Sequence, residues 1–166
     1  MKRHAARTVL LVGEGEAEVL FLQHLKRLYV GRGSGIAVTI KNARGKGAAH
    51  VVDFALRQSR NAAYDCRAAL LDTDTDWNDR VRASARKARV EVLPCEPCLE
   101  ALLLSLHGVH TAGRPTQQLK RDFEHRFGAP ASDTAIHAHH FSGAVIEAAR
   151  AHAPLLNALL LLMTRA

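Results

Sequence analysis

The chain has 166 residues, of which 48% are hydrophobic and 23% are charged. This length and balance fit one globular domain and exclude a disordered or fibrous protein. The 23 lysines and arginines outnumber the 16 aspartates and glutamates, which gives a formal net charge of +7. A basic chain that gathers its acids at a few points suggests a polyanionic partner held by Lys and Arg, although a basic surface also serves solubility alone.

The three cysteines and the absence of a signal-like N-terminus predict a reducing, cytoplasmic setting. The longest apolar run, residues 158–163, is too short to cross a bilayer, so no membrane partner is expected. Cys95 and Cys98 have a zinc-like spacing, but no second cysteine pair follows them. Since a structural zinc needs four ligands, metal binding at this pair is disfavoured.

The first informative stretch is residues 9–12, a short apolar run that stops at Gly13-Glu14-Gly15. Unbroken apolar residues are typical of a strand covered on both faces, as in a parallel sheet. The two glycines allow a sharp turn, and a helical pattern begins directly after them. The sequence therefore places the Glu14 carboxylate at the carboxyl end of a central strand, where open α/β sheets bind their ligands.

A dinucleotide-binding site is the alternative for this turn, because Gly13-x-Gly15 is part of the fingerprint for such sites. Glu18, however, stands where the third small residue is required, and residues 36–42 lack the acid that binds the ribose. The acidic turn would also repel a bare phosphate unless a metal ion lay between them.

A second strand is predicted at residues 36–40, and a loop at 42–47 then opens a helix at 50–59. The loop resembles a phosphate loop, but Lys46 is followed by glycine rather than Ser or Thr, so the chain carries no Walker A motif. Arg44 and Lys46 remain candidates for phosphate contacts near a helix N-terminus. An ordinary flexible loop explains these two residues equally well.

A third strand, residues 67–71, runs into Asp72, Asp74 and Asp76. In extended backbone, residues two apart point the same way, so Asp72 and Asp74 are expected to project together. Two like charges about 4 Å apart cost on the order of 4 kcal/mol at an effective dielectric near 20, and a divalent cation would offset that repulsion. The alternative is an acidic helix cap, which suits Asp76 before a helix that starts at Trp77.

The helix predicted at residues 77–88 and the residue just after it place Arg82, Arg86 and Arg89 on one face, where they suit a nucleic-acid backbone or simply a solvated surface. Residues 90–93 form the fourth predicted strand. Four strands alternating with helices predict an α/β fold with a mainly parallel sheet.

The order of these motifs carries a family resemblance. A strand followed by Glu14-Gly15-x-x-Glu18, and a later strand followed by Asp72-x-Asp74, resemble the Toprim catalytic domain of topoisomerases, primases and overcoming-lysogenization-type nucleases. Residues 96–104, Glu-Pro-Cys-Leu-Glu-Ala-Leu-Leu-Leu, are similar to the Pro-Cys-Phe-Glu-x-Trp-Leu-Leu segment of RloB-like proteins, a small Toprim branch. Leu99 and Ala101 stand where that branch usually has Phe and Trp.

The resemblance covers residues 9–107 and implies a Toprim-like Rossmannoid core at residues 1–107 with a helical C-terminal extension at 108–166, packed on the same domain. It also implies a phosphoryl-transfer site that uses Mg²⁺ or Mn²⁺. Glu14 would be a general acid/base or a metal ligand, and Asp72 and Asp74 would hold the ion. Further acids of the pattern, or beside it, that would serve as additional metal ligands are Glu18, Asp76 and Glu100.

The function that follows from the resemblance is a metal-dependent nuclease that cleaves DNA or RNA phosphodiesters, in phage defence and beside a separate ATPase. The missing P-loop is compatible with that division of labour. The alternative is a non-catalytic Toprim-like module that binds nucleic acid or a partner protein. Convergence of the three main acids, Glu14, Asp72 and Asp74, distinguishes the two.

The C-terminal part predicts an amphipathic helix at residues 116–127 and apolar helical stretches at 144–163, interrupted by Pro154. His137, His139 and His140 cluster, but without a regular ligand spacing they are expected at the surface or in a loop. The apolar residues 155–162 suit either packing on the sheet or a homodimer contact.

Overall fold

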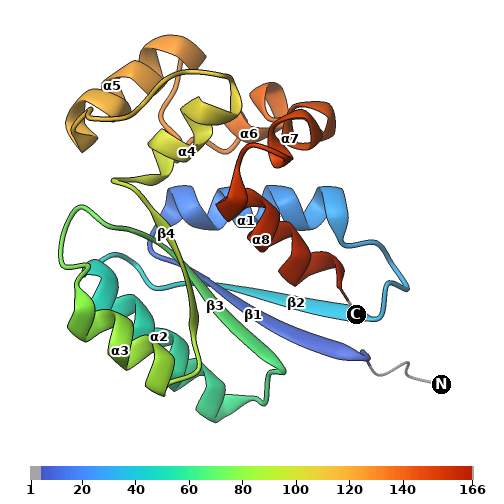
Figure 1. Ribbon diagram of the computed structural model, residues 1–166. Coiled ribbons are helices and arrows are strands. Elements are labelled where there is room, and N and C mark those ends of the chain that lie inside the picture. Colours follow the sequence, from blue (N-terminus) through green and yellow to red (C-terminus); the bar gives the residue numbers. More distant parts are fainter. Residues whose placement is uncertain (1–4, 166) are drawn as a thin grey trace.

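The computed structural model describes residues 5–165, which form an α/β fold of Rossmannoid type (Figure 1). A four-stranded, all-parallel sheet has the order β2-β1-β3-β4. The strands are β1 (Arg7–Gly13), β2 (Ile36–Asn42), β3 (Cys66–Asp72) and β4 (Glu91–Cys95). The described helices are α1 (Glu16–Tyr29), α2 (Gly47–Asn61), α3 (Asp79–Lys87), α4 (Leu99–Leu106), α5 (Thr116–Phe127), α6 (Ile136–His140), α7 (Gly143–Arg150) and α8 (Pro154–Thr164).

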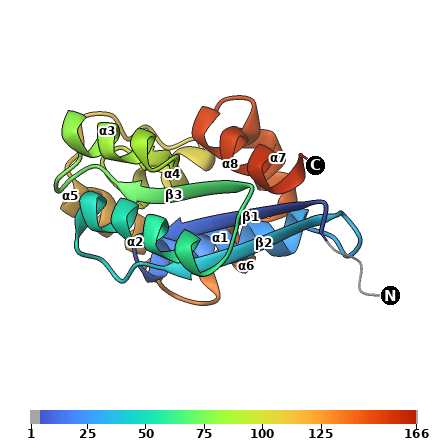
Figure 2. The same cartoon turned by 90° about the horizontal axis from the view of Figure 1, so that it is seen from below.

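Helices cover both faces of the sheet, and this explains why the central strands are apolar throughout. In β1, Val9 and Leu11 join one hydrophobic cluster, while Leu10 and Val12 join the other. Helices α2 and α3 lie over one face, and α1 and α8 lie over the opposite face (Figures 1 and 2). The parallel sheet expected from the alternation of strands and helices is confirmed.

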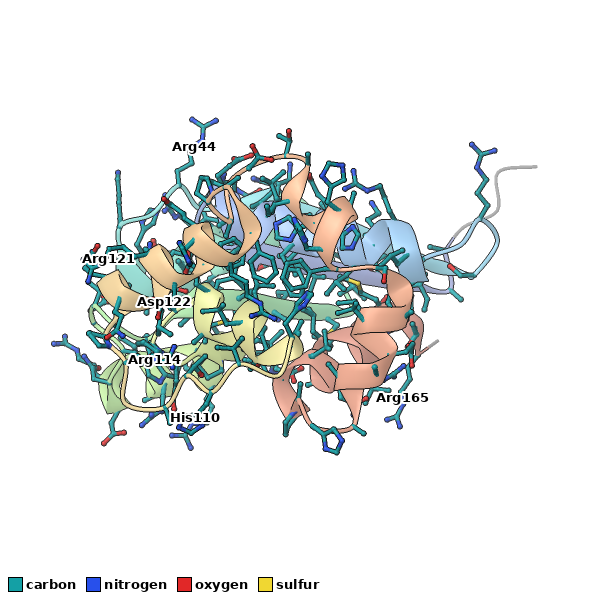
Figure 3. The ribbon with its side chains drawn as sticks, turned by 90° about the horizontal axis from the view of Figure 1, so that it is seen from above. Arg44, His110, Arg114, Arg121, Asp122 and Arg165 are labelled. Carbon is teal, nitrogen blue, oxygen red and sulfur yellow. The ribbon has the colours of Figure 1, made fainter. Side chains whose placement is uncertain are left out.

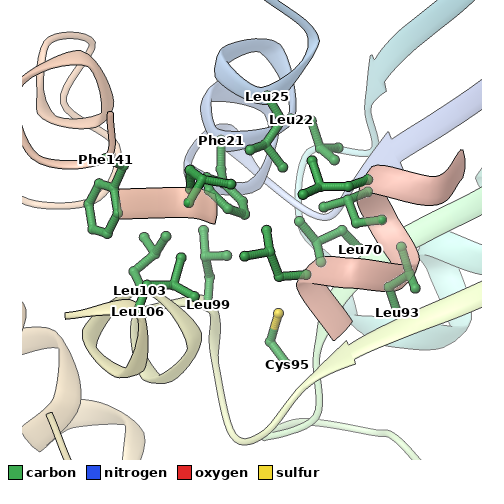
Figure 4. Close-up of a cluster of buried hydrophobic side chains, with 14 of the residues drawn as sticks. Phe21, Leu22, Leu25, Leu70, Leu93, Cys95, Leu99, Leu103, Leu106 and Phe141 are labelled. Atoms are coloured by element: carbon green, nitrogen blue, oxygen red, sulfur yellow. The ribbon is translucent and has the colours of Figure 1, made fainter. Parts of the chain in front are cut away.

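The larger core cluster joins the sheet to the helices of the C-terminal half. Figure 4 shows Leu70 and Leu93 of the sheet in one cluster with Leu99 of α4 and Phe21 of α1. The same cluster includes residues of α5 to α8, among them the fully buried Leu160. The segment after α4 therefore shares its core with the sheet, and its helices fix what lies above the carboxyl ends of the strands.

The start of β1 and the end of α8 are in contact. The Arg7 guanidinium donates to the backbone carbonyls of Leu162 and Arg165, so the start of β1 is tied to the end of α8. Helices α7 and α8 together have the length and apolar composition of a membrane span, but they are bent by 117° relative to each other. No single helix within residues 5–165 is long and apolar enough to cross a membrane.

Several local expectations need correction. The third helix begins at Asp79 rather than Trp77, because the Asn78 side chain accepts a hydrogen bond from the Val81 N–H at 3.1 Å and caps it. His137 was expected at the surface but is 1% exposed in α6, where its ring packs against Phe21 and Phe141. Residues 1–4, which include the basic Lys2 and Arg3, lie outside the described residues.

Candidate active site

The two central strands separate at a topological switch point. The chain leaves β1 through α1 toward β2 on one side, and it leaves β3 through α3 toward β4 on the other. In open α/β sheets, ligands bind in the crevice at the carboxyl ends of such a strand pair. Glu14 directly follows β1 and Asp72 is the last residue of β3, so both acids lie at this crevice.

Glu14 and Asp72 are in direct contact at the switch point. The backbone N–H of Asp72 donates a hydrogen bond to Oε2 of Glu14 at 2.7 Å. The Glu14 N–H in turn donates to the Leu70 carbonyl at 3.1 Å. These two bonds fix the turn after β1 against the end of β3 and bring the two sequence-predicted acids together.

Asp72 lies between the turn after β1 and the turn that leads into α4. Its Oδ1 atom accepts a hydrogen bond from the Leu99 N–H at 3.0 Å, at the first residue of α4. The neighbouring Thr73 N–H bonds to the carbonyls of Cys95 and Pro97 at 3.1 and 3.0 Å. Burial, followed by the negative charges of Glu18, Glu14, Glu100 and Asp74, raises the pKa of Asp72 to about 9. This carboxyl group therefore lies in a field of negative charge.

Glu14 and Glu18 share this field. Burial is the main cause that raises the pKa of Glu14, while its hydrogen bond from Asp72 opposes the shift. Glu18 is 6% exposed, and its Oε2 atom accepts a hydrogen bond from the Gly15 N–H at 2.9 Å, so it caps the first turn of α1. Burial also raises the pKa of Glu18. Glu18 thus combines a structural role in the turn with a charge directed at the crevice.

Asp74 has different partners from Asp72. Strand β3 ends at Asp72, so the strand alternation expected to align the two side chains does not continue to residue 74. Oδ2 of Asp74 accepts a hydrogen bond from the Thr116 hydroxyl at 2.8 Å, at the start of α5. Among residues 5–165, no three His, Cys, Asp or Glu side chains are grouped closely enough to hold one metal ion. The structure therefore brings Glu14 and Asp72 together and leaves Asp74 at the rim.

Asp76 is a helix cap, but for a different helix from the one expected. Its two carboxylate oxygens accept hydrogen bonds from the N–H groups of Ala48 and Ala49 at 2.6 and 3.2 Å. Gly47 lies so close that a Cβ atom there would approach Oδ1 of Asp76 to 2.7 Å. Both oxygens of Asp76 are engaged at the N-terminus of α2, which makes this residue a poor metal ligand.

Glu100 and Lys120 line a pocket of about 250 Å³ beside the acids. Glu100 is 7% exposed in the first turn of α4. Burial acts to lower the pKa of Lys120, but the charges of Glu100, Asp72, Cys98 and Glu18 outweigh it and raise that pKa. Lys120, from α5, is therefore a cation whose pKa is raised by the acids at the crevice.

Cys95 and Cys98 are buried beside Asp72 and remain thiols. Burial raises the pKa of the Cys98 thiol to about 12 and raises that of Cys95 well above its usual range. Metal binding by cysteine requires the thiolate. Without a metal ion, these surroundings therefore disfavour the thiolate form of both residues.

The basic candidates lie on two segments. Arg44 and Lys46 belong to the loop before α2, and Figure 3 shows Arg44 projecting outward from the molecule. The N-terminus of α2 beside them is occupied by the Asp76 carboxylate, so it is not free for a phosphate as the sequence suggested. The expected phosphate contacts of Arg44 and Lys46 are therefore supported only by the exposure of their side chains.

Arg82 and Arg86 lie together on α3 and line a shallow pocket with Trp77. The Arg82 guanidinium lies 5.1 Å from the centre of the Trp77 ring and also pairs with Asp79 at 2.7 Å. Arg89 follows the end of α3 in a left-handed backbone conformation, with φ of 54°. Arg89 therefore does not continue the helical face that was predicted to carry all three arginines.

Two residues of the site were missed by sequence reasoning, Thr116 and Lys120. Both belong to α5, which was recognised as an amphipathic basic helix, but no motif linked that helix to acids more than forty residues earlier. The one feature of the sequence that could have connected this helix to the acids was the positive charge of Lys120. Comparisons with protein-family models, with curated proteins and with solved structures found no match to this chain.

Proposed function

We propose that this protein is a metal-dependent phosphodiesterase that acts on nucleic acid through a Toprim-type site. The observation that carries the proposal is the contact of Glu14 with Asp72 at the switch point, in surroundings that raise the pKa of Asp72 to about 9. Buried acids with strongly raised pKa values, held at the ligand-binding edge of the sheet, are typical of functional sites.

The acids have the donor chemistry that a hard divalent cation prefers. Mg²⁺ usually takes one or two carboxylates and completes its shell with water and substrate phosphate. Glu14 and Asp72 each use one carboxylate oxygen in a backbone hydrogen bond, at 2.7 and 3.0 Å, which leaves each a second oxygen for an ion. Such an ion would supply charge stabilisation for a reacting phosphate. The pair Glu14 and Asp72 fits this ligand number. Asp74 lies apart from the pair, so the convergence expected of a catalytic site is met by two of the three acids, and a non-catalytic binding module is the second candidate function.

The chain's own residues supply the rest of the site. Backbone hydrogen bonds hold Glu14 and Asp72 in fixed orientations, and Lys120 places a cation at the edge of the acidic crevice. Arg82 and Arg86 are exposed on the helix that follows the acidic turn, where they suit the backbone of a polyanion. The motif order shared with Toprim domains supports the same assignment.

Cleavage assays with a plasmid, single-stranded DNA and RNA, each in Mg²⁺, Mn²⁺ or chelator, test the proposal. The parent should cleave at least one of these substrates only when metal is present, and Asp72→Asn should lower the rate by roughly 10²-fold or more. Asp53→Asn is the matched control, because Asp53 is an exposed acid on α2 that pairs with Arg57. Cleavage that survives chelator or the Asp72→Asn change would refute the proposed chemistry. A protein that binds these nucleic acids without cutting them would instead be a binding module.

A further inference from the structure

The pocket beside the acids has an apolar wall and charged side chains that include Glu100 and Lys120. It lies between α1, α4, α5 and the loop before α6, and its volume is about 250 Å³. Pockets for whole drug-sized ligands run from about 300 to 1,000 Å³, so this one suits a single flat ring system. Its apolar wall is formed by Ala17, Phe123 and Ala131, of which Phe123 is fully buried.

The pocket adjoins the acidic crevice at the start of α4. Glu100 lines the pocket and directly follows Leu99, whose N–H binds Asp72. Lys120 lines the same pocket and is influenced by the charges of both Glu100 and Asp72. A group seated in the pocket would therefore lie beside a phosphate at Glu14 and Asp72.

Glu100 offers its carboxylate to the pocket. The residue is 7% exposed, and no N–H or O–H group of the described residues donates a hydrogen bond to its carboxylate. Its oxygens are not among the buried polar atoms that lack a partner within residues 5–165, so they reach the space of the pocket that the residue lines. A ligand with N–H groups in the pocket would therefore find an acceptor that no donor of this part of the chain uses.

We propose that this pocket is a subsite for one guanine base of a nucleic-acid substrate, an inference that rests on the proposed function. Guanine carries two neighbouring donors, N1–H and the N2 amino group, beside the acceptor O6. Glu100 accepts from the two donors, and Lys120 donates to O6. Adenine and cytosine present a single donor beside acceptors, and thymine and uracil present one N–H between two carbonyls, so they match this pair of side chains less well.

A base bound in this pocket is no longer stacked on its neighbouring bases. The substrate is then a single strand, a loop or an extruded nucleotide rather than an intact duplex, because a paired base cannot present its Watson–Crick edge to Glu100. The cleaved bond lies next to the guanine, since the pocket adjoins the acids.

The test measures binding apart from cleavage. Fluorescence anisotropy in chelator compares a short labelled oligothymidylate with the same strand carrying one central guanine or one central inosine, which lacks the N2 amino group. The guanine strand should bind roughly tenfold more tightly than the plain strand, since a good bidentate base contact contributes about 1–3 kcal/mol. The inosine strand should fall between them. Equal affinity for all three strands would overturn the subsite.

Variants separate the pocket from general effects. Glu100→Gln should reduce the guanine preference to less than about twofold, because an amide cannot accept from both donors. Ser132→Trp should do the same by filling the exposed mouth, and it leaves Glu100 unchanged. Glu91→Gln, an exposed acid on β4 that does not line this pocket, is the control and should keep the preference. A guanine preference that persists in Ser132→Trp would place recognition elsewhere.

The cleavage assay distinguishes the two proposals. Metal-dependent cleavage without preference for the bond beside guanine would leave the proposed function intact and overturn the subsite. A guanine preference in binding without metal-dependent cleavage would support the subsite and overturn the nuclease assignment.

Discussion

Asp72 is a residue whose function and stability are expected to move in opposite directions. Without metal, its carboxyl group is buried among Glu18, Glu14 and Glu100, which raise its pKa to about 9. A neutral amide relieves this repulsion, and its oxygen can still accept the hydrogen bond from Leu99. Metal-free Asp72→Asn should therefore melt at the same temperature as the parent or higher.

Magnesium should reverse that order. A ligand that binds only the folded state stabilises it by mass action, so Mg²⁺ at about a hundred times its Kd should raise the Tm of the parent by roughly 5–10 °C. The Asp72→Asn variant should gain much less. Calorimetry on both proteins, with Mg²⁺ or chelator, measures the two effects. A strongly destabilised metal-free variant would show that this carboxylate is a structural cap of α4.

His137 gives a prediction for pH. Its Nε2 atom donates to the Ala131 carbonyl at 3.1 Å, while its buried Nδ1 atom has no partner among the described residues. Burial, aided by the charges of His24 and Arg27, lowers the pKa of His137 to about 4, whereas its bond to Ala131 opposes the shift. The unfolded chain then binds more protons than the folded one between about pH 6.5 and 4, so stability is lost as the pH falls through this window.

The expected loss from His137 is about 3 kcal/mol between pH 7 and pH 4. The buried acids at the crevice act in the opposite direction, because their raised pKa values favour the folded state as the pH falls. The informative measurement is therefore the difference in unfolding free energy between the parent and His137→Gln across this range, with the exposed His110→Gln as control. A parallel pH profile for the parent and His137→Gln would contradict the buried, neutral histidine.

At the scale of elements, the turn between β1 and α1 depends on close packing at Gly13. A Cβ atom there would lie 2.8 Å from Cγ2 and 2.9 Å from the backbone N of Val19. Gly13→Ala should therefore destabilise the protein by about 1–3 kcal/mol, as overpacking commonly does. It should also displace Glu18, whose Cβ would lie 3.1 Å from the added atom. Gly31→Ala is the matched control, because a Cβ atom at that position would meet nothing within 4 Å, and denaturant unfolding compares the two.

The cap of α2 gives a second prediction at this scale. Asp76→Ala removes the acceptor for the N–H groups of Ala48 and Ala49 and should cost about 0.5–2 kcal/mol, with or without metal. Asp76→Asn should recover part of this loss, since its amide oxygen can still accept one of the two bonds. Denaturant unfolding in chelator and in Mg²⁺ provides the measurement. A loss of stability that appeared only with metal would return Asp76 to the metal site.

The elements show where sequence reasoning succeeds. The apolar residues 9–12 and the acidic turn after residue 71 reveal strands and their ligand-binding ends, because a strand buried on both faces has a distinctive composition. Caps were assigned wrongly where the partner is distant: Asp76 binds a helix that begins 29 residues earlier, which no local pattern indicates. The burial of His137 depends likewise on α1, which is remote in sequence.

For the whole molecule, the parallel sheet could be predicted from the alternation of strands and helices. The strand order β2-β1-β3-β4, which brings Glu14 beside Asp72, was not predicted, and the meeting of these acids was expected only from the family resemblance. The position of α5 could not be predicted from the sequence. Its contact with the site consists of one hydrogen bond from Thr116 and the charge of Lys120, and it depends on how a separate group of helices packs on the shared core. The pocket at Glu100 arises from this packing and, for the same reason, could not be predicted from the sequence.

The distribution of positive charge over the whole molecule makes the last prediction. Arg82 lies at the start of α3, the short helix that follows the acidic turn, and Arg86 lies one turn further along it, whereas Arg60 lies in the last turn of the longer α2 and Arg32 in the loop after α1. If nucleic acid crosses the acidic edge, Arg82→Glu with Arg86→Glu should weaken binding of every sequence alike. The slope of log affinity against log salt should fall by roughly 0.7–0.9 per lost phosphate contact.

Arg32→Glu with Arg60→Glu changes the net charge by the same amount and is the control. Anisotropy titrations over a salt series measure all three proteins with one labelled strand. The control should keep the parent's slope, because its charges lie away from the proposed path and act only through the screened field of the molecule. Equal losses in both double variants would mean that net charge alone attracts the nucleic acid, and α3 would then be an ordinary solvated helix.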